Sequence, residues 1–144
     1  MAIETDYLER GLGALERAFT ALRELEAAED PDRVLYEVYR AACVKEFELV
    51  LEQSGKLLKK RLRPWFASNR QADGLILKDA FRHANKHGLI GADACERWLT
   101  YRDNRNDTAH DYGEGFAEAT LKLLPNFLAD AQALAAVIGE ASDE

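Results

Sequence analysis

Apolar residues recur at steps of three and four along most of the chain. In the first segment they are Leu8, Leu12, Leu15, Phe19, Leu22 and Leu25. This spacing places them on one face of an amphipathic helix. The helix is expected to end near "AAEDPD", where Asp30 can act as a cap and Pro31 can take the first position of the next helix.

A longer apolar stripe follows and predicts a second, long helix. Its members are Tyr36, Tyr39, Cys43, Phe47, Val50, Leu51, Ser54, Leu58 and Leu62. Pro64 marks its end or a kink, because proline cannot donate the next helical hydrogen bond. The turn-forming residues of "SNRQADG" then predict a loop.

Three further helices are expected. The third covers about 74–87 and stops at Gly88; the fourth begins at "GADACERW" and continues at least to Arg105. The last begins near Glu114, after a break at two glycines, and Pro125 should kink it. Strand-type alternation is absent. The pattern predicts an all-α fold, a bundle of four to five roughly antiparallel helices, in one domain over 1–144.

Composition adds little beyond the protein class. The 144 residues are 47% hydrophobic and 31% charged, which is typical of a folded globular protein. No uninterrupted apolar run approaches the roughly 20 residues of a membrane span, and the acidic start "MAIETDYLERG" does not resemble a secretory signal. We therefore expect a cytoplasmic protein with no membrane partner. Cys43 and Cys95 are expected to be apolar core residues in a reducing compartment.

The distribution of charge is more informative than its total. The net charge is −7, yet residues 1–32 and 111–144 each carry −6 while residues 33–110 carry +5. A basic middle can still bind an anion, because the local field steers a charged ligand.

The segment "RDNRNDTAHDY", residues 102–112, puts polar groups where a helical pattern should be apolar. At about 100° per residue, Arg105, Arg102, Asn106 and His110 fall on or beside the face defined by Trp98. Burying such groups without partners costs roughly 2–7 kcal/mol each. The segment therefore predicts either an internal network, with Arg102 or Arg105 paired to an acid nearby or on another helix, or a polar cleft.

The cleft would have a definite chemistry. Arginine offers a fork of donors that suits a phosphate, and histidine exchanges protons near neutral pH. Arg105 and His110, supported by Asn106, therefore suit metal-free attack of a ribose 2′-hydroxyl on its neighbouring phosphate. A second general acid or base is still needed, from another group or from a second copy across a symmetric dimer.

The same segment resembles a known family. Arg105-Asn106-Asp107-Thr108-Ala109-His110 matches the R-N-x-x-x-H motif of HEPN domains, and Tyr112 extends it to the R-x4-H-x-Y form of the HepT-like, nucleotidyltransferase-substrate-binding subgroup. The resemblance covers roughly residues 35–130. It includes "VKEFELVLEQSGKLLKK", with Phe47, Glu48, Glu52 and Lys56 in an F-E-x-x-x-E-x-x-x-K pattern, and "LKDAFRHANKHGLI" with Trp98. The chain departs from the residues that are frequent in this subgroup at Ser54-Gly55, a difference that concerns packing more than chemistry.

The resemblance implies a function. HEPN domains are helical bundles that form homodimers with two motifs in one cleft, and many are metal-independent endoribonucleases that need no cofactor. In the HepT-like subgroup the domain is the toxin of a toxin–antitoxin pair. Its antitoxin is a minimal nucleotidyltransferase that transfers AMP to the motif tyrosine. By this resemblance Arg105 and His110 are catalytic, Asn106 is supporting, and Tyr112 is AMPylated. Arg102, which falls beside the same helix face, is expected to support RNA binding together with Asn106.

Two other stretches carry candidate chemistry. "KLLKKRLRPWF" places basic residues beside Trp65 and Phe66 and could bind RNA backbone and a base, although such a run is more often a solvated helix face. "HANKH" places His83 and His87 four residues apart, as on one edge of a metal site. No carboxylate stands at ligand spacing, so a polar helix face is favoured and no metal is expected.

Two alternatives to the enzyme remain. The chain could be a non-catalytic subunit that presents or receives a nucleotide for a nucleotidyltransferase. It could also be a purely structural bundle with a buried polar network, in which Arg105 and His110 serve stability. A P-loop and the G-S-x-x-D of a nucleotidyltransferase are absent, so the chain is not expected to be the transferase itself.

Overall fold

The computed structural model describes the backbone of residues 3–108 and 114–140, and the side chains of residues 3–105 and 115–140. The described parts of the chain form helices and short connections. The helices are α1 (Asp6–Glu26), α2 (Arg33–Leu62), the 3₁₀ turn η1 (Arg63–Trp65), α3 (Asn69–Asp73), α4 (Leu77–Lys86), α5 (Ala92–Thr108) and α6 (Glu114–Gly139). The predicted all-α bundle is confirmed, with its five helices and a short sixth.

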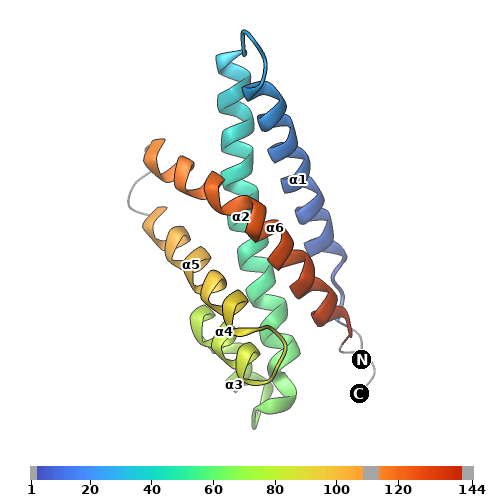
Figure 1. Cartoon of the computed structure of the whole chain (residues 1–144). Helices are drawn as coiled ribbons and strands as arrows, with labels where there is room; N and C mark the ends of the chain where they lie inside the picture. The colour runs from blue at the N-terminus through green and yellow to red at the C-terminus, as the bar shows by residue number, and fades with distance from the viewer. Residues whose placement is uncertain (1–2, 109–113, 141–144) are drawn as a thin grey trace.

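The long helices α1 and α2 run side by side in opposite directions, and α6 crosses them obliquely (Figure 1). The connection between α1 and α2 differs from the prediction. Asp32, not Asp30, caps α2, because its Oδ1 accepts a hydrogen bond of 3.0 Å from the Leu35 amide. Asp32 keeps the extended backbone that a capping residue needs, so Pro31 lies before the helix rather than within it.

The stretch "SNRQADG" is predicted to be a loop, and this is wrong. It contains the five-residue helix α3, whose N-cap is Ser68. The Ser68 hydroxyl accepts a 3.1 Å hydrogen bond from the Gln71 amide, and Ala72 is buried. Residues that favour turns also favour helix ends, and here they act as caps rather than as breakers.

The third predicted helix is shorter than expected. It begins at Leu77, because Ile76 is extended, and it ends before Gly88. Gly88 has a φ of 77°, the left-handed conformation in which glycine most readily ends a helix. The fourth predicted helix, α5, continues three residues beyond Arg105, to Thr108.

The core runs through the bundle, from the buried leucines of α1 to the aromatic residues where α2, α4, α5 and α6 meet. Trp98 is fully buried, stacks on Phe81 with ring centroids 4.6 Å apart, and meets Phe127 edge-on at 5.7 Å. Helices α2 and α4 approach closely at Gly55, since a Cβ there would overlap a terminal methyl carbon of Leu77. The unusual Ser54-Gly55 pair therefore does bear on packing.

By length and composition alone, helix α6 could cross a membrane. A segment of this kind was not expected from the sequence. Its apolar residues instead pack in the bundle: Leu124, Phe127, Leu134 and Ile138 are all fully buried. Its Pro125 lies within the helix. In this structure α6 is a core helix.

Candidate nucleic-acid interface

The buried face of α5 runs through Cys95, Trp98 and Tyr101. Trp98 and Cys95 were expected there, but Tyr101, which is 1% exposed, was not. Tyr101 can be buried because its hydroxyl has a partner. The face is therefore rotated toward Tyr101 relative to the prediction.

That partner is Asp130 of α6, the centre of a compact polar network. Its Oδ2 accepts a hydrogen bond of 2.5 Å from the Tyr101 hydroxyl, and both carboxylate oxygens accept bonds of 2.8 Å from the guanidinium of Arg97. Burial, followed by the hydrogen bond to Asp130, raises the pKa of Tyr101 well above its ordinary value. This network ties α5 to α6 and gives both oxygens of the buried Asp130 carboxylate hydrogen-bond donors.

One turn further along α5, the inward face becomes polar and opens. Arg105 lies opposite α2, where its Nη2 is 4.0 Å from a carboxylate oxygen of Glu48 and 3.8 Å from one of Glu52. These are ion pairs without a close hydrogen bond, and the Nε of Arg105 is buried with no hydrogen-bond partner. The Arg105 side chain is 26% exposed. Its guanidinium is held loosely, with donors left for another acceptor.

Arg105 borders an open groove of about 610 Å³ between α2, α5 and the start of α4. Six basic side chains line it: Lys56, Lys59, Lys60, Arg63, Arg102 and Arg105. Only two acidic side chains line it, Glu52 and Asp73, so the groove has a net positive lining despite the acidic chain. Such a lining suits a polyanion.

The far end of the groove is fixed by an ion pair. Arg63 donates two hydrogen bonds to Asp73, of 3.0 and 2.8 Å, across the turn between α2 and α3. The hydrogen bond from Arg63 lowers the pKa of Asp73 below its ordinary value. Asp73 therefore stays ionised and holds η1 and α3 together at this end.

The structure joins two features that the sequence kept separate. The lysines of "KLLKKRLRPWF" and the arginines of "RDNRNDTAHDY" line one groove, although they lie far apart in the sequence. Of the predicted site residues, Arg102 and Arg105 are placed here. The side chain of Asn106, and His110 and Tyr112 altogether, lie outside the described residues.

Glu48 and Glu52 received no role from the sequence beyond their place in the resemblance. They occupy successive turns of α2, with Lys56 on the turn after, on the side that faces Arg105. Their four-residue spacing is the signal that could have identified them, because acidic residues in such a row face a single neighbour. The expected alternative of an acid on another helix is therefore present, in a loose form.

The histidines of "HANKH" lie against aromatic rings. His87 stacks on Trp65 with ring centroids 4.3 Å apart, and His83 meets Phe66 edge-on at 5.0 Å. Within residues 3–105 and 115–140 no group of three or more potential ligands could hold a metal ion. The histidines face aromatic rings that follow the basic run.

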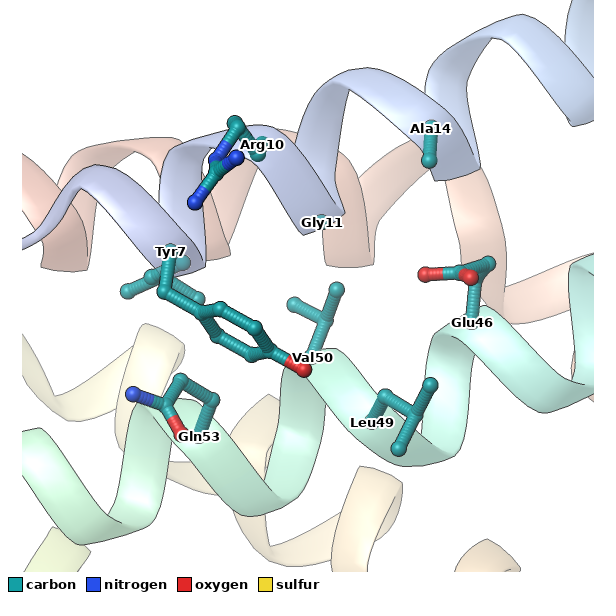
Figure 2. Close-up of a pocket in the computed structure, with 9 residues that line it drawn as sticks. Tyr7, Arg10, Gly11, Ala14, Glu46, Leu49, Val50 and Gln53 are labelled. Carbon is teal, nitrogen blue, oxygen red and sulfur yellow. The ribbon is translucent and has the colours of Figure 1, made fainter.

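A second hollow, of about 280 Å³, lies between α1 and α2. Figure 2 shows Tyr7 reaching across it toward Val50 and Gln53, with Arg10 and Glu46 near its edges. Its lining includes one basic and one acidic side chain, so it lacks the charge of the groove. None of the predicted site residues lines it.

Comparisons with known proteins bear on the family and the fold of the chain. The family model described as "Nucleotidyltransferase substrate binding protein like" matches residues 10–139. A Haemophilus influenzae protein named "Probable ribonuclease HepT" is 26% identical over 132 residues, which are 92% of this chain and 89% of the relative.

Solved structures give the same result. HI0074 from Haemophilus influenzae, described as revealing the fold of a substrate binding domain of a nucleotidyltransferase, superposes with a TM-score of 0.81. It is 25% identical, and the match covers 94% of this chain and 98% of that one. A structure from Thermus thermophilus has a TM-score of 0.61 and 29% identity, over 89% of this chain and 98% of that one. The chain therefore belongs to the nucleotidyltransferase substrate binding protein-like family, of HepT-like, HEPN-type helical domains.

Proposed function

We propose that this protein is a metal-independent endoribonuclease toxin that acts on RNA, such as tRNA or mRNA, in the groove between α2 and α5. One observation carries the proposal: Arg105 stands loosely paired in a groove lined by five other basic side chains. The similarity to a probable HepT ribonuclease supports the same function.

The proposed reaction needs few groups. The 2′-hydroxyl oxygen attacks the adjacent phosphorus as the bond to the 5′-oxygen breaks, giving a 2′,3′-cyclic phosphate and a 5′-hydroxyl. His110 moves the proton, Arg105 stabilises the charge that grows on the phosphate, and Arg102 and Asn106 support the RNA. The 5′-oxygen must also gain a proton. A second copy of the motif in a homodimer is the proposed source.

Regulation is proposed to act at Tyr112. A cognate minimal nucleotidyltransferase antitoxin would transfer AMP from ATP to its hydroxyl and release pyrophosphate. The added group brings bulk and negative charge two residues from His110, which blocks the cleft and repels RNA. The intact mass after incubation with the partner and ATP should rise by one or more AMP units. The same mass gain in Tyr112→Phe would remove Tyr112 from the proposal.

Cleavage in the presence of EDTA is the experiment that tests the ribonuclease. Purified protein should cut RNA and leave 2′,3′-cyclic phosphate ends, whereas His110→Ala should lose this activity. Arg82→Ala is a matched surface control, since Arg82 is exposed on α4, outside the groove, and pairs with Asp79 of its own helix. Equal cleavage by wild type and His110→Ala would overturn the proposal that this protein is a ribonuclease.

A second function is supported by the family description and by HI0074. In it the chain is a non-catalytic subunit that presents or receives a nucleotide for a nucleotidyltransferase. The same basic groove would then hold the phosphates of a nucleotide. This function predicts complex formation and nucleotide binding without RNA cleavage. Growth arrest by the protein alone, lost in Arg105→Ala, would exclude it.

A further inference from the structure

An aromatic column lies where the basic run of α2 ends. Trp65 stacks on His87 with centroids 4.3 Å apart and planes 11° apart, and His83 continues the stack at 6.3 Å and 14°. Phe66 closes the far side by meeting His83 edge-on. Trp65 ends this column and is 42% exposed, with His87 stacked on its ring and the guanidinium of Arg61 over it.

The two tryptophans of the chain lie in different surroundings. Trp98, the other tryptophan, is fully buried in the core. Trp65 instead follows Pro64 in the 3₁₀ turn η1, which ends α2 and carries the chain toward α4. The ion pair of Arg63 with Asp73 fixes the turn that presents the indole. The exposed ring is therefore carried by a turn that an ion pair holds in place.

A guanidinium lies over this ring, and further basic side chains precede it in the sequence. The guanidinium carbon of Arg61 lies 5.3 Å from the indole centroid. Arg63, two residues before Trp65, lines the groove that also contains Lys59, Lys60 and Arg105. Basic side chains beside an exposed aromatic face are the combination that binds single-stranded nucleic acid, with phosphates on the cations and a base on the ring.

The length of α2 between Arg105 and Trp65 sets how many nucleotides of RNA can lie between these two residues. From Glu52, beside Arg105, to Arg63 is a rise of about 16 Å at 1.5 Å per residue. At about 3.4 Å per nucleotide in a stacked strand this holds roughly five nucleotides, and fewer in an extended one. A dinucleotide bound at Arg105 cannot reach Trp65.

We infer that Trp65, supported by His87 and flanked by Arg61, is a base-stacking subsite for single-stranded RNA that runs along the groove from Arg105. The inference rests on the proposed ribonuclease and adds to it a preference for unpaired substrates several nucleotides long. It gives "KLLKKRLRPWF" both a backbone-binding and a base-binding part.

Binding of a non-cleavable, 2′-O-methylated single strand of eight nucleotides tests the subsite. Trp65→Ala should weaken binding about 5- to 150-fold, the loss of one base–aromatic stack, while Trp65→Phe should keep most of the affinity. Tyr7→Ala is the matched control, because Tyr7 is an exposed aromatic residue on α1 outside the groove. Cleavage of a dinucleotide should be the same in Trp65→Ala and wild type, which also reports that the variant is folded.

The outcomes separate the two proposals. If the wild type cuts RNA and Trp65→Ala binds the octamer as tightly as the wild type, the subsite is overturned and the proposed ribonuclease stands. Loss of dinucleotide cleavage in Trp65→Ala also overturns it, since the residue would then serve the fold. Wild type that neither binds nor cuts RNA overturns both.

Discussion

Helix α5 carries two arginines that face carboxylates of neighbouring helices, and the two are held very differently. Arg97 makes two bonds of 2.8 Å to Asp130, whose remaining capacity is used by Tyr101. Arg105, two turns later, has only ion-pair distances of 3.8 and 4.0 Å to Glu52 and Glu48. At the first site both oxygens of the Asp130 carboxylate have hydrogen-bond donors, and the contact joins α5 to α6. The second has donors to spare and borders an open groove.

The difference teaches where a polar residue serves the fold and where it can serve a ligand. Asp130 is 9% exposed, so its charge must be neutralised within the protein. Glu52, with 64% of its side chain exposed, is solvated and holds Arg105 weakly. A purely structural polar network describes the Arg97 site, where the hydrogen bonds are short. At Arg105 the ion pairs are longer, and a role in binding a ligand stays a prediction.

The largest expected effect is on catalysis. Arg105→Ala should lower the rate of RNA cleavage about 10²- to 10³-fold, because it removes a donor that stabilises transition-state charge. Its free energy of unfolding should change by less than about 1 kcal/mol, since the ion pairs it loses are long and partly solvated. Single-turnover cleavage and urea unfolding measure the two quantities. A large loss of stability would place Arg105 in the scaffold.

The opposite pattern is expected at the saturated site. Tyr101→Phe removes one hydrogen bond to a buried carboxylate and should lower the free energy of unfolding by about 1.5–3 kcal/mol. Cleavage per folded molecule should stay at the wild-type level. Denaturant unfolding with the same cleavage assay checks both, and unchanged stability would contradict the importance of the Asp130 network.

The same tyrosine gives the protein a defined response to alkali. Its pKa is raised in the folded state from an ordinary value of 10.0, so the neutral phenol is favoured by folding. The contribution of Tyr101 to the free energy of unfolding is complete below about pH 10. It is lost as the pH rises further toward the pKa of the folded state. The stability gap between wild type and Tyr101→Phe should therefore be smaller at about pH 11 than at about pH 8. A constant gap in urea titrations would contradict this prediction.

The smallest effects are expected from single lysines of the groove. Lys59→Ala or Lys60→Ala should each weaken RNA binding about 1.5- to 5-fold and lower the slope of log affinity against log salt by about 0.7. Lys122→Ala, on the exposed side of α6, is the matched control. Fluorescence anisotropy over a range of salt concentrations measures both. A control with the same loss would mean that overall charge, not the groove, governs binding.

Periodicity was enough to predict the bundle, because helices that bury one face must show that face in the sequence. It failed at short segments, where capping decides: Asp32 rather than Asp30 starts α2, and Ser68 starts a helix within a predicted loop. At the site, angular spacing placed Arg102 and Arg105 beside the buried face, and the motif supplied their roles. The spacing of Glu48 and Glu52 marks an acidic row that faces a neighbour, but only the packing of α2 against α5 shows that this neighbour is Arg105.

Binding of a non-cleavable RNA to two arginine variants of α5 tests the central claim most directly. Arg105→Ala should weaken binding of a 2′-O-methylated strand about 10- to 100-fold, the loss of a charge-assisted contact to phosphate. Arg97→Ala, measured where it remains folded, should bind as tightly as wild type because Arg97 serves Asp130. Equal affinities for wild type and Arg105→Ala would contradict the account, and so would a loss of the same size in both variants.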